Sequence, residues 1–389
     1  MAVCLQDPVV DFLKADAKDE KAALDAAVKS LKGNFKQALD AVRAVPPLSS
    51  LAPGVHHDLK FKSGKQEWDY SLRLPKEYDG KKRFPVLMLP DHGDIDPNDG
   101  IGFWEKDRDH IEKVILFRPV IVRHKQDVAR FPDQKPLAIH PAIAAVMRDA
   151  LSHLRLHYAV DADRISMTGL SQVGFYTWFI GVSLPDQFAV IVPESAGGPI
   201  VPTFIEPFAL NLKSVPVRIL HTKGDKRTPY EHAELMEKAI RTAGGQVELI
   251  SFTDVDYTTP NELLHPVPFQ KRLEHVLPWT LEQKRELPTT FTRYLRYPQQ
   301  GAEGRFRVTS SFDWQKPLTV TFREEKGELS VQGADAVYQV SPDDVLEGKP
   351  FTVNKKKIKP KADLELLLRS FKATGDLRRL AAAEIPLKP

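Results

Sequence analysis

Short apolar runs alternate with helical segments from residue 84 to residue 285, and this rhythm constrains the fold more than any other feature of the chain. Apolar runs of strand length lie at 84–89, 114–122, 165–168, 188–193, 217–221 and 247–252. Segments with helical spacing lie at 139–157, 174–182, 228–243 and 272–285. Strands that alternate with helices form a mostly parallel sheet flanked by helices. We therefore predict an α/β domain here.

Different patterns flank this region. Residues 9–45 are rich in Ala, Lys, Asp and Leu, with apolar residues three or four apart, which predicts one or two amphipathic helices that end at Pro46-Pro47. After Pro288, short alternating segments separated by Gly, Pro and Asp predict a small β module, followed by a helix within 362–380.

These patterns predict three parts. We expect an N-terminal helical segment at 1–50, a domain at 55–290 that opens with a hairpin over 57–74, and a β-rich C-terminal module at 300–389. We also expect the N-terminal helices to pack beside the core of the central domain.

Composition excludes several classes of protein. The 389 residues contain 55 Lys and Arg against 52 Asp and Glu, which gives no basis for a nucleic-acid partner. The single cysteine, Cys4, can form neither an intramolecular disulfide nor a cysteine-based metal site. No apolar stretch approaches the ~18 residues of a membrane span, and Met1–Gln6 is too short for a signal peptide. We expect a soluble protein, cytoplasmic or exported with its leader removed.

The stretch from Asp161 to Trp178 carries the strongest chemical signal. It reads Asp-Ala-Asp-Arg-Ile-Ser-Met-Thr-Gly-Leu-Ser-Gln-Val-Gly-Phe-Tyr-Thr-Trp, and it places Ser171 between a β-rich run and a helix. A sharp turn at this point lifts the serine clear of the sheet, and the amide of Gln172 points into the space that its hydroxyl would attack. Such geometry serves acyl transfer.

This stretch resembles the nucleophile elbow of the α/β-hydrolases, in particular the esterase and prolyl-oligopeptidase-like branch. That elbow commonly reads Asp-x-Asp-Arg-x-x-x-x-Gly-Leu-Ser-Met-Gly-Gly-x-x-Thr-Trp, and the resemblance extends over about residues 66–290. It implies an α/β-hydrolase fold, with Ser171 as the nucleophile. The elbow is degenerate at Val173, where the family has a glycine, and a β-branched residue there is expected to strain or open it.

The resemblance also implies two partners for Ser171. Asp225, in the sequence His-Thr-Lys-Gly-Asp-Lys-Arg-Thr-Pro after the run at 217–221, occupies the acid position; the alternative is an acid at a helix N-terminus. The family has a histidine soon after the next strand, where direct alignment places Tyr257, which cannot act as the base at neutral pH. His265 is the candidate base if the loop is longer, or else a surface histidine. His275, within a predicted helix, is expected to be structural.

The second oxyanion donor should come from the loop that follows 84–89. Relatives have His-Gly-Gly-type residues there, and this chain has Pro-Asp-His-Gly-Asp, so the amide of Asp91 or His92 is expected to act with that of Gln172. Of the two, the resemblance implies the amide of His92. The aspartates crowding this loop are ordinary turn formers, so we expect no metal and no cofactor.

The reaction implied by the resemblance is acyl transfer to water. The first substrate class is an ester of a carbohydrate, aryl or short-chain acid, either small or borne on a polymer. A prolyl-oligopeptidase-like peptidase is the second. A third hypothesis is a hydrolase-fold protein that has lost turnover and binds a ligand in the old cleft, which Val173 and Tyr257 would both favour. The oligomeric state is left open.

Overall fold

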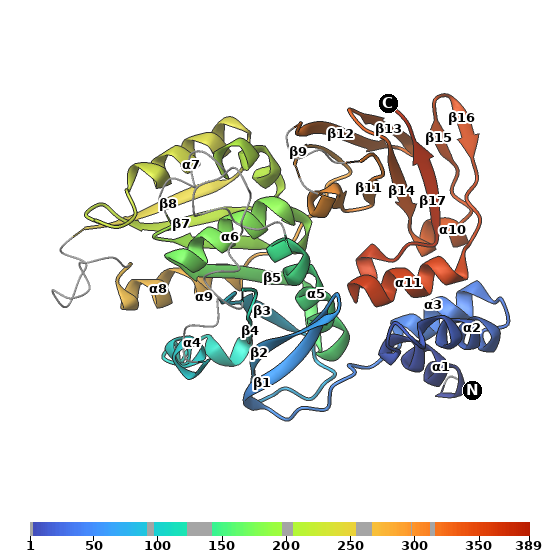
Figure 1. Ribbon diagram of the computed structural model, residues 1–389, viewed down its shortest axis with the longest axis horizontal. Coiled ribbons are helices and arrows are strands. Elements are labelled where there is room, and N and C mark those ends of the chain that lie inside the picture. Colours follow the sequence, from blue (N-terminus) through green and yellow to red (C-terminus); the bar gives the residue numbers. More distant parts are fainter. Residues whose placement is uncertain are drawn as a thin grey trace.

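The computed structural model describes residues 3–91, 97–122, 142–196, 205–253, 267–296, 298–311 and 316–389. A central eight-stranded sheet dominates it, in the order β1-β2-β4-β3-β5-β6-β7-β8 (Figure 1). The strands are β1 (Gly54–Ser63), β2 (Gln66–Leu74), β3 (Phe84–Met88), β4 (Ile115–Pro119), β5 (Val160–Leu170), β6 (Val190–Glu194), β7 (Val217–Thr222) and β8 (Val247–Phe252).

The pairing of these strands defines the fold. β1 and β2 form the predicted antiparallel hairpin, and β2 pairs antiparallel with β4. From β3 to β8 every pairing is parallel, and β3 lies between β4 and β5. An antiparallel hairpin followed by a parallel sheet with this crossover is the α/β-hydrolase fold, as predicted.

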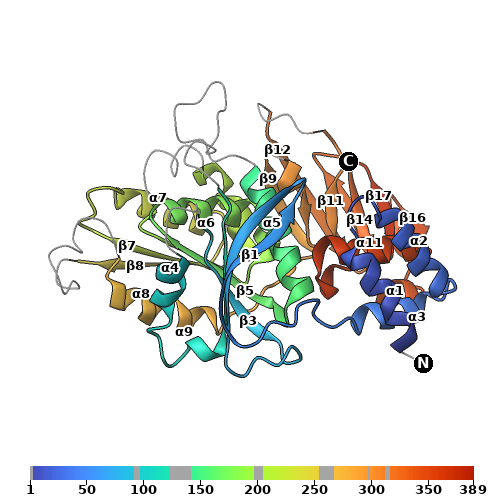
Figure 2. The same cartoon turned by 60° about the horizontal axis from the view of Figure 1, so that its bottom comes forward.

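Helices cover both faces of the sheet because its strands are apolar on both sides. Val86 and Met88 of β3 join the core under α5 (Ala142–His157), α6 (Gln172–Ser183) and α7 (Glu231–Thr242). Leu87, between them, joins a second core with α4 (Pro97–Trp104), α8 (Phe269–His275) and α9 (Leu277–Thr280). Figure 2 shows these two groups of helices on opposite sides of the sheet.

The predicted helix over 272–285 is wrong in extent. The structure has two short helices, α8 and α9, which meet at Val276, and regular helix ends at Thr280. Pro278 lies in the first turn of α9, where its missing N–H is tolerated, but a continuous helix would need that N–H.

The C-terminal part contains two sheets that share one apolar core. One has the order β16-β15-β13-β12-β9 and the other β10-β11-β14-β17. Their strands are β9 (Thr290–Leu295), β10 (Ala302–Glu303), β11 (Phe306–Val308), β12 (Leu318–Glu325), β13 (Glu328–Gln332), β14 (Ala336–Val340), β15 (Phe351–Val353), β16 (Lys356–Ile358) and β17 (Ala383–Leu387). Two helices, α10 (Pro342–Leu346) and α11 (Leu364–Thr374), lie between β14 and β17 in the chain.

The N-terminal helices are α1 (Val3–Lys14), α2 (Glu20–Ser30) and α3 (Phe35–Arg43). Their buried side chains, such as Phe12 and Leu39, form a core with Leu367 and Phe371 of α11. Among the described residues of the central domain, only Leu156, at the end of α5, contributes to that core. The helices therefore pack mainly on the C-terminal module (Figure 1), and the expectation that they pack beside the central core is wrong.

An ion-pair cluster joins the C-terminal module to the central domain. Arg285 donates to Asp376 at 2.8 Å and to Asp163 at 2.8 Å. Arg379 pairs with Asp186 at 2.9 Å, and the Asp186 carboxylate also accepts the N–H of Gly304 at 2.8 Å. The charged part of the contact between the two parts is thus largely closed to water.

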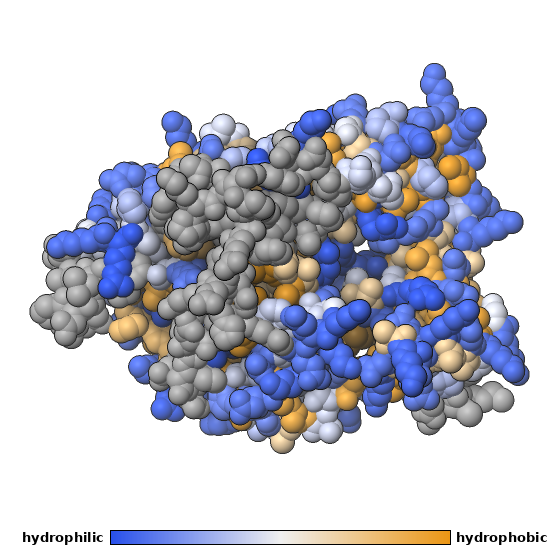
Figure 3. Space-filling model, viewed as in Figure 1, coloured by the Kyte–Doolittle hydropathy of each residue, from blue (hydrophilic) through white to orange (hydrophobic). Residues whose placement is uncertain are grey.

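Polar side chains dominate the described surface visible in Figure 3, with apolar residues in small patches. Among the described residues, the large hydrophobic side chains that remain clearly exposed are Val55, Phe269 and Leu346. No helix in these ranges is long and apolar enough to cross a membrane.

Candidate active site

Ser171 lies at the sharp turn between β5 and α6. Its backbone has φ 57° and ψ −118°, a conformation that non-glycine residues seldom adopt. Its N–H donates to the carbonyl of Glu194 at 2.8 Å, and its own carbonyl accepts the N–H of Phe175 at 3.2 Å. The surrounding structure therefore holds the serine in a strained conformation at the carboxyl end of the sheet.

Two glycines allow this turn. A Cβ on Gly169 would lie 2.5 Å from Cγ1 of Val173, and a Cβ on Gly174 would lie 2.6 Å from Cβ of Ala196 and 2.9 Å from the carbonyl oxygen of Glu194. Gly174 thus provides the close approach of helix and strand, while Val173 packs over the bare Cα of Gly169. Of the two effects expected of Val173, strain or opening of the elbow, these contacts contradict the opening, and strain stays a prediction.

Gln172 is the first residue of α6. Its main-chain N–H has no carbonyl one turn earlier in the helix to bond, and it lies at the positive end of the helix dipole. The side-chain amide donates to the hydroxyl of Tyr176 at 2.9 Å, so the side chain is engaged along the helix. The main-chain amide is therefore the group of Gln172 that can face an oxyanion.

The other weighed donor, Asp91, is committed elsewhere. Its N–H donates to the carbonyl of Pro119 at 3.0 Å, and its carbonyl accepts the N–H of Ile121 at 2.8 Å. These bonds extend the pairing of β3 and β4 beyond the strands, so the amide of Asp91 cannot also bind an oxyanion. The other candidate, His92, lies outside the described residues.

Asp225 lies in the turn after β7, and its side chain is buried. One carboxylate oxygen accepts the N–H of Arg227 at 2.8 Å and that of Thr228 at 2.9 Å, and the other accepts the Thr228 hydroxyl. Nε2 of His221 lies 3.8 Å from Oδ2 of Asp225. Because α7 begins only at Glu231, this acid is not part of the first turn of a helix. Ser171 and Asp225 follow β5 and β7, which are separated in the sheet by β6 alone.

Of the residues considered for the position of the catalytic base, the structure describes His275. His265, the candidate base, and Tyr257, the residue aligned with it, both lie outside the described residues. His275 is at the end of α8, where its ring lies 5.8 Å from that of Phe252 and burial lowers its pKa. This contact with a residue of the second core agrees with a structural role.

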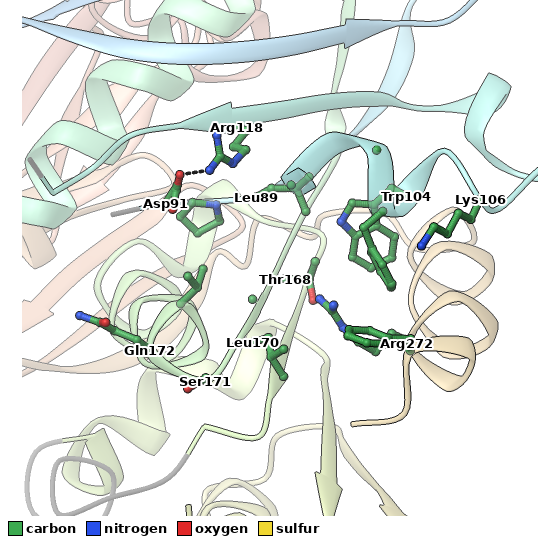
Figure 4. A pocket seen from close by; sticks show the side chains of 17 residues that line it. Leu89, Asp91, Trp104, Lys106, Arg118, Thr168, Leu170, Ser171, Gln172 and Arg272 are labelled. Carbon is green, nitrogen blue, oxygen red and sulfur yellow. Dashed lines mark hydrogen bonds and ion pairs between the residues drawn. The ribbon is translucent and has the colours of Figure 1, made fainter. Parts of the chain in front are cut away.

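A pocket of about 770 Å³ opens above Ser171 (Figure 4). Residues 168–173 line one side of it and residues 89–91 another. The remaining wall comes from α4 with Lys106 after it, from α8, and from Arg118 of β4. Its size suits a ligand of a few hundred daltons.

One buried ion pair lies where the chain leaves β3. Arg118 of β4 donates to the Asp91 carboxylate, and both side chains are almost wholly buried. Gly100 of α4 makes room for this arginine, since a Cβ there would lie 2.6 Å from the Arg118 Nε.

A second buried ion pair lies under the elbow. The Glu194 carboxylate accepts the Thr168 hydroxyl at 2.7 Å and is held by Nε of Arg272 at 2.5 Å and by its Nη2 at 3.2 Å. Glu194 has no exposed surface, and Arg272 is 9% exposed. Sequence reasoning missed both residues. One sequence feature could have indicated Glu194: it is a glutamate at the carboxyl end of an otherwise apolar strand, β6.

The described residues contain no group of three or more His, Cys, Asp or Glu side chains placed to hold a metal ion.

Comparisons with known proteins found no matching family model and no matching curated protein. Among solved structures, the chain is similar to a thermostable esterase at 23% identity and a TM-score of 0.49, over 59% of this chain and 63% of that one. It is similar to Est1E from Butyrivibrio proteoclasticus at 14% identity and a TM-score of 0.41, over 58% and 97%. Similarity to an acylaminoacyl peptidase from Pyrococcus horikoshii is at 13% identity and a TM-score of 0.39, over 52% and 37%.

Proposed function

We propose that this chain of α/β-hydrolase fold is a serine hydrolase that cleaves carboxylic esters through an acyl-enzyme. One observation carries the proposal: Ser171 has the strained backbone of a nucleophile elbow and lines a pocket of about 770 Å³. A serine held at positive φ costs stability, and such strain persists where it serves a site.

The proposed mechanism assigns each residue one role. Oγ of Ser171 attacks the ester carbonyl carbon while His265 takes the hydroxyl proton, and Asp225 orients and stabilises the protonated His265. The main-chain amides of Gln172 and His92 bind the oxyanion. The C–O bond to the alcohol then breaks, and His265 returns the proton to the leaving oxygen. Water, activated by His265, releases the acid and restores Ser171.

Turnover of 4-nitrophenyl acetate and butyrate tests this proposal, together with labelling by a fluorophosphonate probe. In Ser171→Ala, both turnover and labelling should vanish, with kcat falling by about 10⁴-fold or more. Since alanine is also strained at φ 57°, Ser171→Gly should give the same loss with a relaxed backbone. The exposed Ser330 of β13 gives the matched control, Ser330→Ala, which should retain both signals.

His265→Ala then tests the base and Asp225→Asn the acid. Wild-type protein that neither turns over these esters nor reacts with the probe would overturn the proposal and favour a ligand-binding protein. Cleavage of peptide p-nitroanilides with no cleavage of esters would favour a peptidase.

A further inference from the structure

We propose that the pocket beside Ser171 selects esters that carry a carboxylate on an apolar or aromatic body, with the carboxylate bound at Arg272 and Lys106. The inference rests on the proposed function for its catalytic readout and on the pocket wall for its chemistry.

Arg272 lines the pocket, whereas its acidic partner, Glu194, does not. Its Nε and Nη2 bond to Glu194, which has no exposed surface and is not part of the wall, whereas Arg272 itself lines the cavity. No acceptor for Nη1 of Arg272 is found among the described residues. Figure 4 shows the guanidinium beside Thr168, on the pocket side of the elbow. A bound carboxylate would therefore meet a guanidinium whose counter-charge lies behind it.

Lys106 places a second cation against the ring of Phe103, which the Arg272 guanidinium also approaches. Its ammonium lies 5.9 Å from the centroid of Phe103, and the Arg272 guanidinium lies 4.4 Å from that centroid. Lys106 is exposed, and it has no ion pair within the described part of the chain. One aromatic ring is thus approached by two cations from two different segments.

Within the described residues, the other charges around the pocket are paired and do not cancel the charge of Lys106. Arg118 and Asp91 neutralise each other in the wall. Beyond Phe103, Asp107 bonds to His110 at 2.9 Å, and Glu274 bonds to Lys271 at 2.8 Å. Glu194 likewise neutralises Arg272 from behind, so the net positive charge among the described lining residues is that of Lys106, at the Phe103 end.

Aromatic side chains at the same end define the body of the ligand. The Phe103 ring lies 5.0 Å from that of Trp104 and 5.8 Å from that of Phe269. Phe269 is 48% exposed, and among the described residues it is the one aromatic side chain that is clearly exposed. An apolar or aryl group can cover these rings while an attached carboxylate reaches the two cations.

The test compares two esters of matched length, mono-4-nitrophenyl adipate and 4-nitrophenyl hexanoate. Wild-type protein should prefer the anionic ester in kcat/KM by about threefold to tenfold, the effect of one partly exposed charge pair. Lys106→Met should remove most of the preference and Lys106→Glu should reverse it. Lys113→Met, which alters an exposed lysine outside the pocket wall, should keep it. The preference should also fall as salt is raised.

Arg272 needs a paired change, because its removal alone leaves Glu194 buried without a counter-charge. The variant Arg272→Gln/Glu194→Gln keeps hydrogen bonding but removes both charges. Combined with Lys106→Met, it should abolish the part of the kcat/KM preference for the anionic ester that Lys106→Met alone retains. Thermal unfolding of this variant checks that the fold persists.

Equilibrium binding separates this inference from the proposed function. Ser171→Ala protein is titrated calorimetrically with 4-phenylbutyrate and with the neutral 4-phenylbutanamide, and the carboxylate should bind about threefold to tenfold more tightly. Cleavage of both esters at equal efficiency with equal binding of both ligands would overturn the inference and leave the hydrolase intact. Preferential binding of the carboxylate without turnover of any ester would support the inference and overturn the hydrolase.

Discussion

The main-chain carbonyl of Glu194 accepts the N–H of Ser171 at 2.8 Å, while the carboxylate of the same residue pairs with Arg272 of α8. The Thr168 hydroxyl, on the strand that leads into the elbow, donates to that carboxylate. A single buried residue therefore connects the turn at Ser171, the strand before it and the helix that forms the opposite wall of the pocket.

Glu194→Gln should accordingly destabilise the protein and slow any reaction at Ser171. The amide keeps the shape but leaves Arg272 buried without its counter-charge, which typically costs about 3–5 kcal/mol of unfolding free energy. Urea unfolding measures this cost. Glu384→Gln, which breaks the surface pair with Arg307, should cost below about 1 kcal/mol. Equal costs for the two variants would contradict the role assigned to Glu194.

Val173→Gly, which restores the glycine expected from the family pattern, should weaken the protein. The Val173 side chain is only 9% exposed and packs against Gly169, so its removal loses buried apolar surface and adds backbone freedom in the helix. Together these effects should cost about 2–3 kcal/mol. Thermal unfolding checks the sign. A higher melting temperature for Val173→Gly would show that valine strains the elbow after all.

Gly174→Ala should be more damaging than Val173→Gly. Its Cβ would meet the Glu194 carbonyl oxygen at 2.9 Å, and this atom belongs to the backbone that holds Ser171. The helix can then only move away from β6, which displaces the elbow. Fluorophosphonate labelling should fall sharply in Gly174→Ala. Gly181→Ala, in the same helix, would meet the end of the Ile191 side chain at 2.6 Å and should keep most of its labelling.

The strand and helix rhythm and the elbow were predictable because both are local. Apolar runs of strand length became β3 to β8, and Ser171 lies between β5 and α6 as its neighbours indicated. The pairing of Glu194 with Arg272 was not predictable, because 78 residues separate them and the sequence around either residue gives no indication of its partner. Strand β17 was not predictable for the same reason: its partner in the sheet, β14, ends more than forty residues earlier in the chain.

Asp376→Asn should loosen the junction between the central domain and the C-terminal module. Asp376 has no exposed surface and bonds to Arg285, and the arginines around it hold the pKa of its carboxyl well below its usual range despite burial. Loss of its charge should cost about 3–5 kcal/mol. Asp343→Asn, which breaks an exposed pair with Arg43, is the matched control and should cost below about 1 kcal/mol. Similar urea midpoints for the two variants would count against the junction.

Acidification should unfold the protein in a window set by two histidines of α5. Burial lowers the pKa of His153 to about 3 and also lowers the pKa of His157, whose ring stacks on that of His153 at 3.9 Å. In the unfolded chain both rings titrate near pH 6.5, so below about pH 6.5 the unfolded state binds more protons, and for His153 this holds down to about pH 3. The unfolding free energy is therefore greatest above pH 6.5 and falls below it, by up to about 1.4 kcal/mol per pH unit for each histidine.

Urea titrations at pH 8, 6.5, 5 and 4 measure this slope, and His153→Phe isolates one contribution to it. Phenylalanine fills the same space but loses the 3.0 Å bond between Nε2 of His153 and the Tyr70 hydroxyl, at a cost of about 1 kcal/mol at pH 8. Below pH 6.5 the variant should lose stability more slowly than the wild type, so that the two curves converge or cross. His56→Phe, at the start of β1, should keep the wild-type slope. A slope unchanged in His153→Phe would mean that His153 does not stay neutral in the folded protein.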